Sequence, residues 1–274
     1  MSGTFELTIR PRKGWQAVDL KEAYLYSELL LFLIWRDIKI RYRQTLLGGL
    51  WAVLQPFLAM TIFAFVFNRL AHVQSDGPPY KLFAFAGLAP WTFFSTAVTQ
   101  SSNSLLANQQ LVSKIYFPRL FIPLGAIFAL LVDLILSLGL LALLMVYYRW
   151  ALTSAVIWLP LFMVSAVLAA SGTGLILSAL NVRFRDVKYA VPFMIQMGLF
   201  LTPVIYPVHY VPVRWQLLMG LNPMTGVVIG FRHALLGTPI PWNVTAVSLV
   251  ICVLLFVVGL FVFRRLESEF ADIL

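Results

Sequence analysis

The residue types that most often carry chemistry are few in this chain, and they do not cluster. It has three histidines, His72, His209 and His233, and one cysteine, Cys252. Metal ligands recur at short spacings, and these histidines do not. A single cysteine excludes an intrachain disulfide and a metal site built from cysteines. The sequence therefore predicts no metal site.

Nucleotide-binding motifs are also missing from the sequence. No glycine is followed by lysine, so the chain lacks the G-x-x-x-x-G-K loop that cradles ATP phosphates. Gly172-Thr173-Gly174 does not follow a predicted strand, so it is not a dinucleotide fingerprint. Instead, Ala170, Gly174 and Ser178 recur every four residues, a spacing typical of close helix packing in lipid. We predict no catalytic residue and no cofactor in this chain.

Asp133 is the one acidic residue inside a clear apolar span. Placing a carboxylate there costs roughly 2.5–3.5 kcal/mol on insertion scales. Such a group either relays protons or makes a structural hydrogen bond to a neighbouring helix. Relays usually contain several titrating groups in a chain, so we favour the structural hydrogen bond.

The composition is that of a membrane protein. Hydrophobic residues make up 61% of the 274 residues and charged residues 11%, whereas soluble domains contain about 25% charged residues. The net charge is +9, but the bases lie beside apolar spans, which indicates membrane topology rather than binding to nucleic acid. No apolar core precedes Leu29, so we expect no cleavable signal peptide.

The fold class that follows is an all-α integral membrane protein with six transmembrane helices. Apolar runs of about 20 residues divide the chain into a cytoplasmic segment, 1–45, and a transmembrane domain, 46–274. The predicted spans are 46–70, 82–102, 120–146, 152–180, 192–206 and 242–263. This topology leaves five of the 20 lysines and arginines outside, which predicts that both termini are cytoplasmic.

The region before the last span, residues 207–241, is apolar but contains five prolines. Non-helical backbone at membrane depth survives only where protein or a wet cavity surrounds it. We predict two short re-entrant or interfacial helices on the outer side, joined near Asn222-Pro223. The alternative is a seventh span.

An amphipathic interface helix is predicted before the first span. Glu22 to Thr45 reads as a helix in which Arg36, Lys39 and Arg43 share one face. Such a helix lies on membrane lipid, where each base contributes on the order of 1 kcal/mol, or it contacts a cytoplasmic partner. The charges alone leave both roles open.

The inner loops carry no chemistry of their own. Asn103 to Ile115 is predicted to form a short helix that Pro118 ends, with Leu111 and Ile115 on one apolar edge. The second inner loop, residues 181–192, is short and basic. A cytoplasmic face of this kind indicates that another subunit supplies the energy.

Aromatic residues make up 15% of the chain, more than interface belts require. Aromatic faces in a conduit let sugar rings slide, because they offer apolar contact without fixed hydrogen bonds. Packing is the commoner role of any single ring. The candidates for lining a conduit are Trp51, Phe57, Phe63, Trp91 and Phe94.

A series of short motifs, taken in order, resembles one family. The motifs are Arg36-Asp37, Arg41-Tyr42, Leu47-Gly48, Trp51, Gln55-Pro56, Pro79-Tyr80, Gly87-Leu88, Pro90-Trp91, Asn108 with Lys114, Tyr116-Phe117-Pro118, Asn181-Val182, Arg185-Asp186, Pro203-Val204-Ile205-Tyr206 and Asn222-Pro223. From about Leu33 to the C-terminus, the chain resembles the membrane subunit of type-2 polysaccharide ABC exporters. This class exports lipopolysaccharide O-antigen, capsular polysaccharide or teichoic acid.

The resemblance implies a homodimer of six-span subunits in the bacterial inner membrane. It also implies two nucleotide-binding ATPase subunits, which hold ATP and Mg, and an undecaprenyl-linked polysaccharide as substrate, with O-antigen the leading candidate. The positions that would couple to the ATPase are Asn108, Gln109, Leu111, Lys114 and Ile115, together with Arg36 and Lys39. The outer gate would contain Tyr206, Arg214, Asn222 and Pro223.

Two other functions stay open. One is export of a smaller lipid or a drug by the same broad class of transporter. The other is an integral-membrane transferase acting on lipid-linked sugars, which needs acidic or histidine residues clustered at one membrane face. The outer side offers only Asp76 and the scattered histidines, so the sequence disfavours the transferase.

Overall fold

The computed structural model describes residues 26–43, 50–70, 72, 75, 77–114 and 117–270. Every regular element in this part of the chain is helical, as the sequence predicts. The elements are α2 (Ser27–Arg43), α3 (Leu50–Phe63), η1 (Ala64–Leu70), α4 (Tyr80–Ala107), α5 (Gln109–Lys114), α6 (Phe121–Ala129), α7 (Leu131–Tyr147), η2 (Ser154–Trp158), α8 (Leu159–Arg183), α9 (Val187–Leu201), η3 (Val208–Tyr210), α10 (Val213–Met219), α11 (Pro223–Leu236) and α12 (Trp242–Glu267).

Five helical segments among the described residues are long and apolar enough to cross a membrane. They are Val53–Leu70, Tyr80–Ala107, Phe121–Tyr147, Ser154–Arg183 and Trp242–Glu267. Each overlaps one of the predicted spans, in the same order. The third of them joins α6 and α7 through Leu130. The multi-pass helical membrane architecture is thus confirmed at the level of these five segments.

Helix α9 is a sixth apolar helix, and it does not coincide with the predicted span at 192–206. It begins five residues earlier and ends at Leu201, so Pro192 lies inside it. The residue before a proline is pushed out of the helical region, and Thr202, which precedes Pro203, is extended with φ −97° and ψ 140°. Fifteen residues cover about 22 Å, less than the ~30 Å of a bilayer core.

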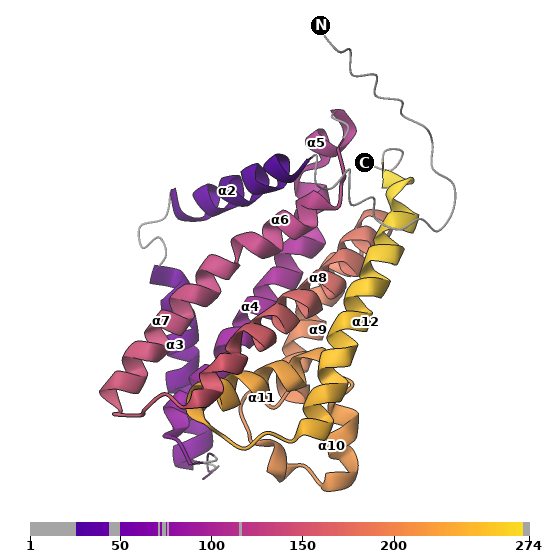
Figure 1. The fold of residues 1–274 in the computed structure, drawn as a ribbon. Helices are drawn as coiled ribbons and strands as arrows, with labels where there is room; N and C mark the ends of the chain where they lie inside the picture. Colours follow the sequence, from indigo (N-terminus) through magenta and orange to yellow (C-terminus); the bar gives the residue numbers. More distant parts are fainter. Residues whose placement is uncertain are drawn as a thin grey trace, which may run out of the picture.

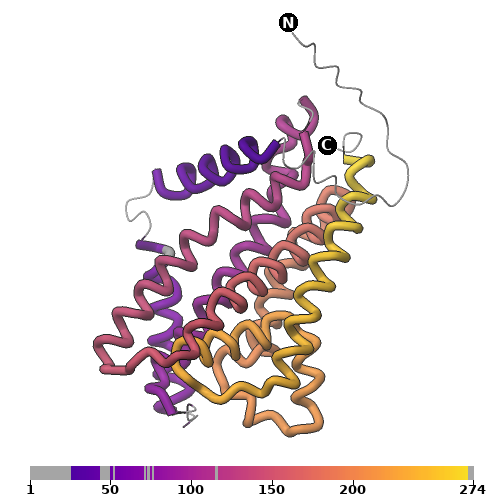
Figure 2. The backbone as a smooth tube through the Cα atoms, in the orientation of Figure 1, coloured from indigo at the N-terminus to yellow at the C-terminus, as the bar shows by residue number. Residues whose placement is uncertain are grey.

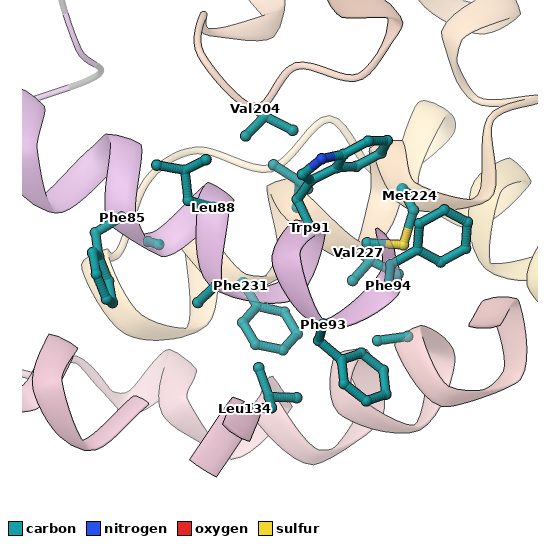
Figure 3. Packing of buried hydrophobic residues seen from close by; sticks show 14 of the residues in the cluster. Phe85, Leu88, Trp91, Phe93, Phe94, Leu134, Val204, Met224, Val227 and Phe231 are labelled. Atoms are coloured by element: carbon teal, nitrogen blue, oxygen red, sulfur yellow. The ribbon is translucent and has the colours of Figure 1, made fainter. Parts of the chain in front are cut away.

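Helix α4 forms the centre of the bundle. Its 28 residues extend over about 42 Å, and it packs against α3, α6, α7, α8, α9 and α11. Figure 3 shows Trp91, Phe93 and Phe94 of α4 among side chains of α7 and α11, such as Leu134 and Phe231. The core therefore follows α4 along the bundle.

Small residues bring the central and C-terminal helices into close contact. A Cβ added at Gly259 of α12 would lie 2.6 Å from the carbonyl oxygen of Gly172 on α8. A Cβ at Gly174 would lie 2.6 Å from Ser101 Oγ on α4. Ala170, Gly174 and Ser178 are all buried. The close helix packing predicted from their spacing is confirmed.

Helix α2 lies crosswise over one end of the bundle (Figures 1 and 2). Glu28 in its first turn and Arg41 and Arg43 in its last turn have the signs that the helix dipole favours. Its buried residue, Leu33, packs beside Gly125 of α6. Helix α5 and the C-terminal end of α12 lie at the same end, whereas α10 and α11 lie at the opposite end (Figure 1).

The segment between α9 and α12 contains two short helices, α10 and α11, joined at Asn222-Pro223. The Asn222 side chain accepts a hydrogen bond from the Met224 backbone N–H at 3.0 Å, and Pro223 takes the first helical position. Gly237 ends α11 with φ 71°, in the left-handed region. The helices have 7 and 14 residues, too few for a span of about 20. Neither helix therefore reaches the length of a transmembrane span on its own, and the number of crossings stays a prediction.

Candidate functional site

Asp133 joins the third span to the N-terminal helix. Arg41 Nη2 on α2 lies 2.7 Å from Asp133 Oδ2 on α7, and the Tyr42 hydroxyl donates a hydrogen bond to Asp133 Oδ1. The Asp133 side chain is 13% exposed and that of Arg41 30%. Asp133 therefore makes a hydrogen bond to a neighbouring helix, as predicted, while its role as a structural residue rather than a proton relay stays a prediction. Its partners on α2 are residues that sequence reasoning did not pair with Asp133.

Tyr42 keeps its proton at this contact. Burial, followed by the hydrogen bond to the Asp133 carboxylate and the charge of that carboxylate, raises the pKa of the Tyr42 phenol above its usual value. The phenol therefore remains a hydrogen-bond donor at neutral pH. One ion pair and one charge-assisted hydrogen bond thus fix the end of α2 to α7.

A cavity of about 220 Å³ lies beside this contact, between α2, α3, α4 and α7. Its polar and aromatic lining comes from all four helices: Arg41, Tyr42, Trp51, Gln55, Thr92, Phe93, Thr96, Asp133 and Ser137. Ala89, Leu130 and Leu134 complete the wall. The sequence singles out Trp51 as a conduit aromatic and Asp133 as a buried acid, on two different spans. The tertiary structure places both on one cavity.

The predicted conduit aromatics fall into two groups. Trp51 and Phe57 on α3 are exposed, with 53% and 36% of their surface accessible, and Phe63 is half-buried. Trp91 and Phe94 on α4 are 6% and 9% exposed, and their ring centroids lie 5.7 Å apart inside the core (Figure 3). The five rings therefore do not form one surface in this arrangement.

The segment predicted as one short helix, Asn103 to Ile115, is divided in the structure: its first five residues end α4, and Gln109–Lys114 form the short helix α5. Asn108 ends α4 by donating from its side chain to the Ser104 carbonyl oxygen at 2.8 Å. Val112 is buried with Leu33 in a second core cluster, which ties α5 and α2 to the same packing unit. Gln109 and Lys114 are exposed and Leu111 is half-buried, whereas Ile115 lies outside the described residues.

Arg36 and Lys39 make local contacts on α2. Arg36 Nη2 lies 2.9 Å from the carboxylate of the adjacent Asp37. The Lys39 ammonium lies 5.3 Å from the centroid of the Trp35 ring, within cation–π range. Both residues belong to the helix that shares one end of the bundle with α5 (Figure 1). A role in coupling stays a prediction for both.

Two of the predicted gate residues are anchored to the end of α9. The Tyr206 hydroxyl donates to the Phe200 carbonyl oxygen at 3.1 Å. Asn222 donates from its side-chain amide to Thr202 Oγ1 at 2.7 Å. Arg214 is instead exposed on α10, where its guanidinium lies 5.7 Å from the Trp215 ring centroid.

Pro223, the fourth predicted gate residue, is connected to the last span. Its carbonyl oxygen accepts a hydrogen bond from Ser248 Oγ of α12 at 2.8 Å. Ser248 Oγ also accepts from the Gly226 backbone N–H at 2.8 Å. The turn that begins α11 is therefore tied to both α9 and α12. The gate assignment itself stays a prediction.

Arg232 on α11 connects several elements at the end of the molecule that carries the predicted gate residues. Only its charge was used in the sequence analysis. Arg232 is 3% exposed. Its Nε donates to the Phe83 carbonyl oxygen at 3.1 Å and its Nη1 to the Pro203 carbonyl oxygen at 2.6 Å. The guanidinium stacks 3.5 Å from the centroid of the Phe83 ring. It also lines a second cavity, of about 310 Å³.

No group of three or more histidine, cysteine or acidic residues that could hold a metal ion occurs within the described ranges. Cys252 is buried in α12, and its thiol donates to the Pro223 carbonyl oxygen at 3.3 Å. His233 Nδ1 lies 2.7 Å from the Thr238 carbonyl oxygen. These two potential ligands thus serve packing and local backbone contacts.

Comparison with curated proteins gives relatives along nearly the whole chain. The O-antigen export system permease protein RfbA of Myxococcus xanthus is 30% identical over 258 residues, covering 92% of this chain and 98% of the relative. The RfbA protein of Klebsiella pneumoniae is 29% identical over 252 residues, covering 92% and 96%. The polysialic acid transport protein KpsM of Escherichia coli is 26% identical over 204 residues, covering 73% and 78%.

One protein family also matches the sequence directly. The family described as ABC-2 type transporter matches residues 28–236, which is well over half of the chain. The matched range begins in α2 and ends with α11, so it includes the Asp133 contact, the coupling segment and the predicted gate. With this match and the multi-pass helical bundle, the chain belongs to the ABC-2 type transporter family.

Proposed function

We propose that this chain is the membrane permease subunit of an ATP-driven exporter that moves a lipid-linked polysaccharide, an O-antigen, out of the cytoplasm. The observation that carries the proposal is its similarity, over 92% of its length, to proteins named as O-antigen export permeases. Capsular polysaccharide is the second candidate, supported by the shorter match to the polysialic acid transport protein.

The energy for export comes, in this proposal, from two nucleotide-binding ATPase subunits that hold ATP and Mg. Their docking face is the end of the bundle that carries α2 and α5 (Figure 1). Exposed Gln109 and Lys114 supply polar contacts there, and half-buried Leu111 supplies an apolar one. Val112 and Leu33 belong to one buried cluster. A displacement of α5 by the ATPase would therefore shift the side chains that pack around α2.

The topology that we propose has six membrane crossings and both termini in the cytoplasm of a bacterial inner-membrane protein. Helix α9 makes the fifth crossing with the turn residues 202–206 that follow it. Helices α10 and α11 then re-enter from the outer side. The burial of α11, together with the bonds of Asn222 to Thr202 and of Ser248 to Pro223, supports a backbone that is shielded by protein.

The substrate conduit lies, in this proposal, between two copies of the chain. Helix α3 and the η1 segment that follows it support this because they expose a large apolar face: Trp51, Leu58 and Ile62 on α3 and Phe65 on η1 are each about half accessible. A second subunit would cover part of that face, and the remaining aromatics, with Phe57 and Phe63, would form the wall. Trp91 and Phe94 pack behind this wall in the core.

Deletion of the gene and complementation with the intact chain test the function. We expect the deletion strain to lose surface polysaccharide and to accumulate lipid-linked glycan in the cytoplasm, measured by gel electrophoresis of lipopolysaccharide and by mass spectrometry of extracted lipids. Loss of the glycan from both places would instead indicate a biosynthetic transferase. Unchanged glycan with altered drug sensitivity would indicate a small-molecule exporter.

A further inference from the structure

The polar side chains that line the cavity beside Asp133 occur in pairs with helical spacing. Three helices each contribute a pair of polar or amphipathic side chains at i, i+4 spacing, which places the two members of a pair on one helix face. The pairs are Trp51 and Gln55 on α3, Thr92 and Thr96 on α4, and Asp133 and Ser137 on α7. The rest of the lining on these helices is apolar: Ala89, Phe93, Leu130 and Leu134. Three amphipathic faces thus converge within helices that are otherwise apolar.

The hydroxyls of Thr92 and Thr96 line a cavity, and, like those of Thr225 and Thr245, they lack the backbone hydrogen bond that several threonines of the bundle make. Thr99, Thr173 and Thr202 each donate to the carbonyl oxygen four residues earlier. Thr92 and Thr96 make no side-chain hydrogen bond to another described residue, and neither does Gln55. Polar groups kept in an apolar environment are costly without a partner. Their common orientation toward one cavity indicates a ligand with several hydroxyl groups.

The charge of the cavity favours a neutral ligand. Arg41 and Asp133 neutralise one another at 2.7 Å, and the Tyr42 hydroxyl already donates to the carboxylate. A phosphate would meet the Asp133 carboxylate on the cavity wall, which like-charge repulsion disfavours. Hydroxyl groups can donate to the carboxylate and accept from the guanidinium, so a polyhydroxylated neutral group suits the pair.

The size and the aromatic wall restrict the ligand further. The volume of about 220 Å³ is below the roughly 300–1,000 Å³ of sites for drug-sized ligands, so it fits one ring rather than a chain. The Trp51 indole is 53% exposed and lines the cavity with Gln55 beside it. An indole face packs well against the apolar face of a sugar ring while polar neighbours bond the hydroxyls.

We propose that this cavity binds one neutral sugar residue of the exported glycan at the α2 end of the protein. The inference rests on the proposed function, because the sugar belongs to the lipid-linked substrate. The Arg41–Asp133 pair then has two tasks, since it holds α2 against α7 and presents both charges to sugar hydroxyls. The site lies within one subunit, on the four helices that line it.

Protection of an introduced cysteine tests the site. Thr96→Cys places a thiol on the cavity, while Cys252 is buried and serves as the unreactive background. The permease complex with its ATPase is placed in lipid nanodiscs and treated with a small neutral maleimide. The probe is the host's own extracted lipid-linked glycan. We expect the modification rate to fall about tenfold when the probe is at roughly ten times its Kd.

Two controls make the result specific. Thr173→Cys on α8 is also half-buried but does not line the cavity, so its modification rate should not change with the probe. Undecaprenyl diphosphate without sugar should leave Thr96→Cys unprotected. Equal protection by this lipid would overturn the sugar assignment in favour of headgroup binding. Equal protection of both cysteines would show general shielding and would overturn the site.

Failure of the site can be told apart from failure of the proposed function. If surface glycan depends on the gene but the glycan does not protect Thr96→Cys, the site is wrong and the function stands. If surface glycan is independent of the gene, the function is wrong. Should Thr96→Cys fail to assemble, Ser137→Cys exchanges one atom on the same cavity, and lack of protection there overturns the proposal equally.

Discussion

Arg41 on α2 and Asp133 on α7 are joined by a 2.7 Å ion pair, although 92 positions separate them in the chain. The pair connects a helix that lies crosswise over the bundle to a membrane-spanning helix. A carboxylate within an apolar span is costly alone. The contact therefore accounts for both the acid in the span and the position of the end of α2.

Replacing Asp133 should destabilise the protein, because the partly buried Arg41 guanidinium would lose the carboxylate that pairs with it. We expect Asp133→Ala to lower the free energy of unfolding by about 1–3 kcal/mol, less than for a fully buried pair because Arg41 is 30% exposed. Thermal unfolding in detergent measures this. Asp37→Ala, which breaks only the pair with adjacent Arg36, should change stability by less than ~1 kcal/mol. Equal effects of the two variants would contradict a special role for the α2–α7 pair.

Asp133→Asn separates the structural role from proton transfer. Asparagine keeps an acceptor for the Tyr42 hydroxyl but loses the charge and cannot titrate. We expect glycan export to fall, because the ion pair to Arg41 and a charge on the proposed sugar site are lost, and the remaining export to keep the pH dependence of the wild-type protein. Measurement of export in vesicles across neutral pH checks this. A change in the pH profile would instead assign Asp133 to a proton relay.

Arg232→Lys should loosen the end of the molecule that carries α11. The guanidinium bonds carbonyl oxygens of Phe83 and Pro203 at once, and a lysine ammonium cannot reproduce this fork. Each lost charged hydrogen bond costs about 1.5–3 kcal/mol. We expect faster hydrogen exchange in residues 202–206 and at the start of α11. Arg214 is exposed, so Arg214→Lys should leave the exchange rates unchanged. Similar exchange rates in both variants would contradict the proposed role of the Arg232 hydrogen bonds in holding this end together.

Gly172→Ala should be destabilising and Gly139→Ala should not. A Cβ at Gly172 would lie 2.5 Å from the backbone of Leu255 on α12, whereas a Cβ at Gly139 on α7 meets nothing within 4 Å. Overpacking costs about 1–3 kcal/mol, and alanine in place of an open helical glycine gains roughly 0.5–1 kcal/mol. Thermal unfolding should therefore shift in opposite directions. A shift of the same sign would contradict the close α8–α12 packing.

Lys114→Glu combined with Leu111→Ala should weaken binding of the ATPase subunit. The change reverses an exposed charge and removes an apolar contact on α5. We expect less ATPase to copurify and less glycan to reach the surface. Lys81→Glu, an exposed lysine in the first turn of α4 away from α5, is the matched control and should do neither. Intact copurification and export in the double variant would remove α5 from the coupling assignment.

The local sequence was sufficient for the elements themselves. The apolar runs predicted the five long segments because a span needs a continuous hydrophobic length. The asparagine and proline at 222 and 223 predicted the junction of two short helices, which the structure places at the start of α11, where capping is a local interaction. The predicted fifth span begins at Pro192, whereas α9 contains this proline and ends at Leu201. The restriction at the end of the helix comes from Pro203, which holds Thr202 in an extended conformation.

The sequence by itself determined that this is a basic, multi-pass helical membrane protein, since hydrophobic length, charge position and proline restrictions act over a few residues. Only the tertiary structure decided which polar groups meet. In the tertiary structure, Arg41, Trp51 and Asp133 line one cavity. Arg232 stacks on Phe83. Trp91 is buried in the core, whereas Trp51 is exposed. Such choices depend on how helix faces rotate and pack against one another, and the spacing of residues along a single helix does not contain that information.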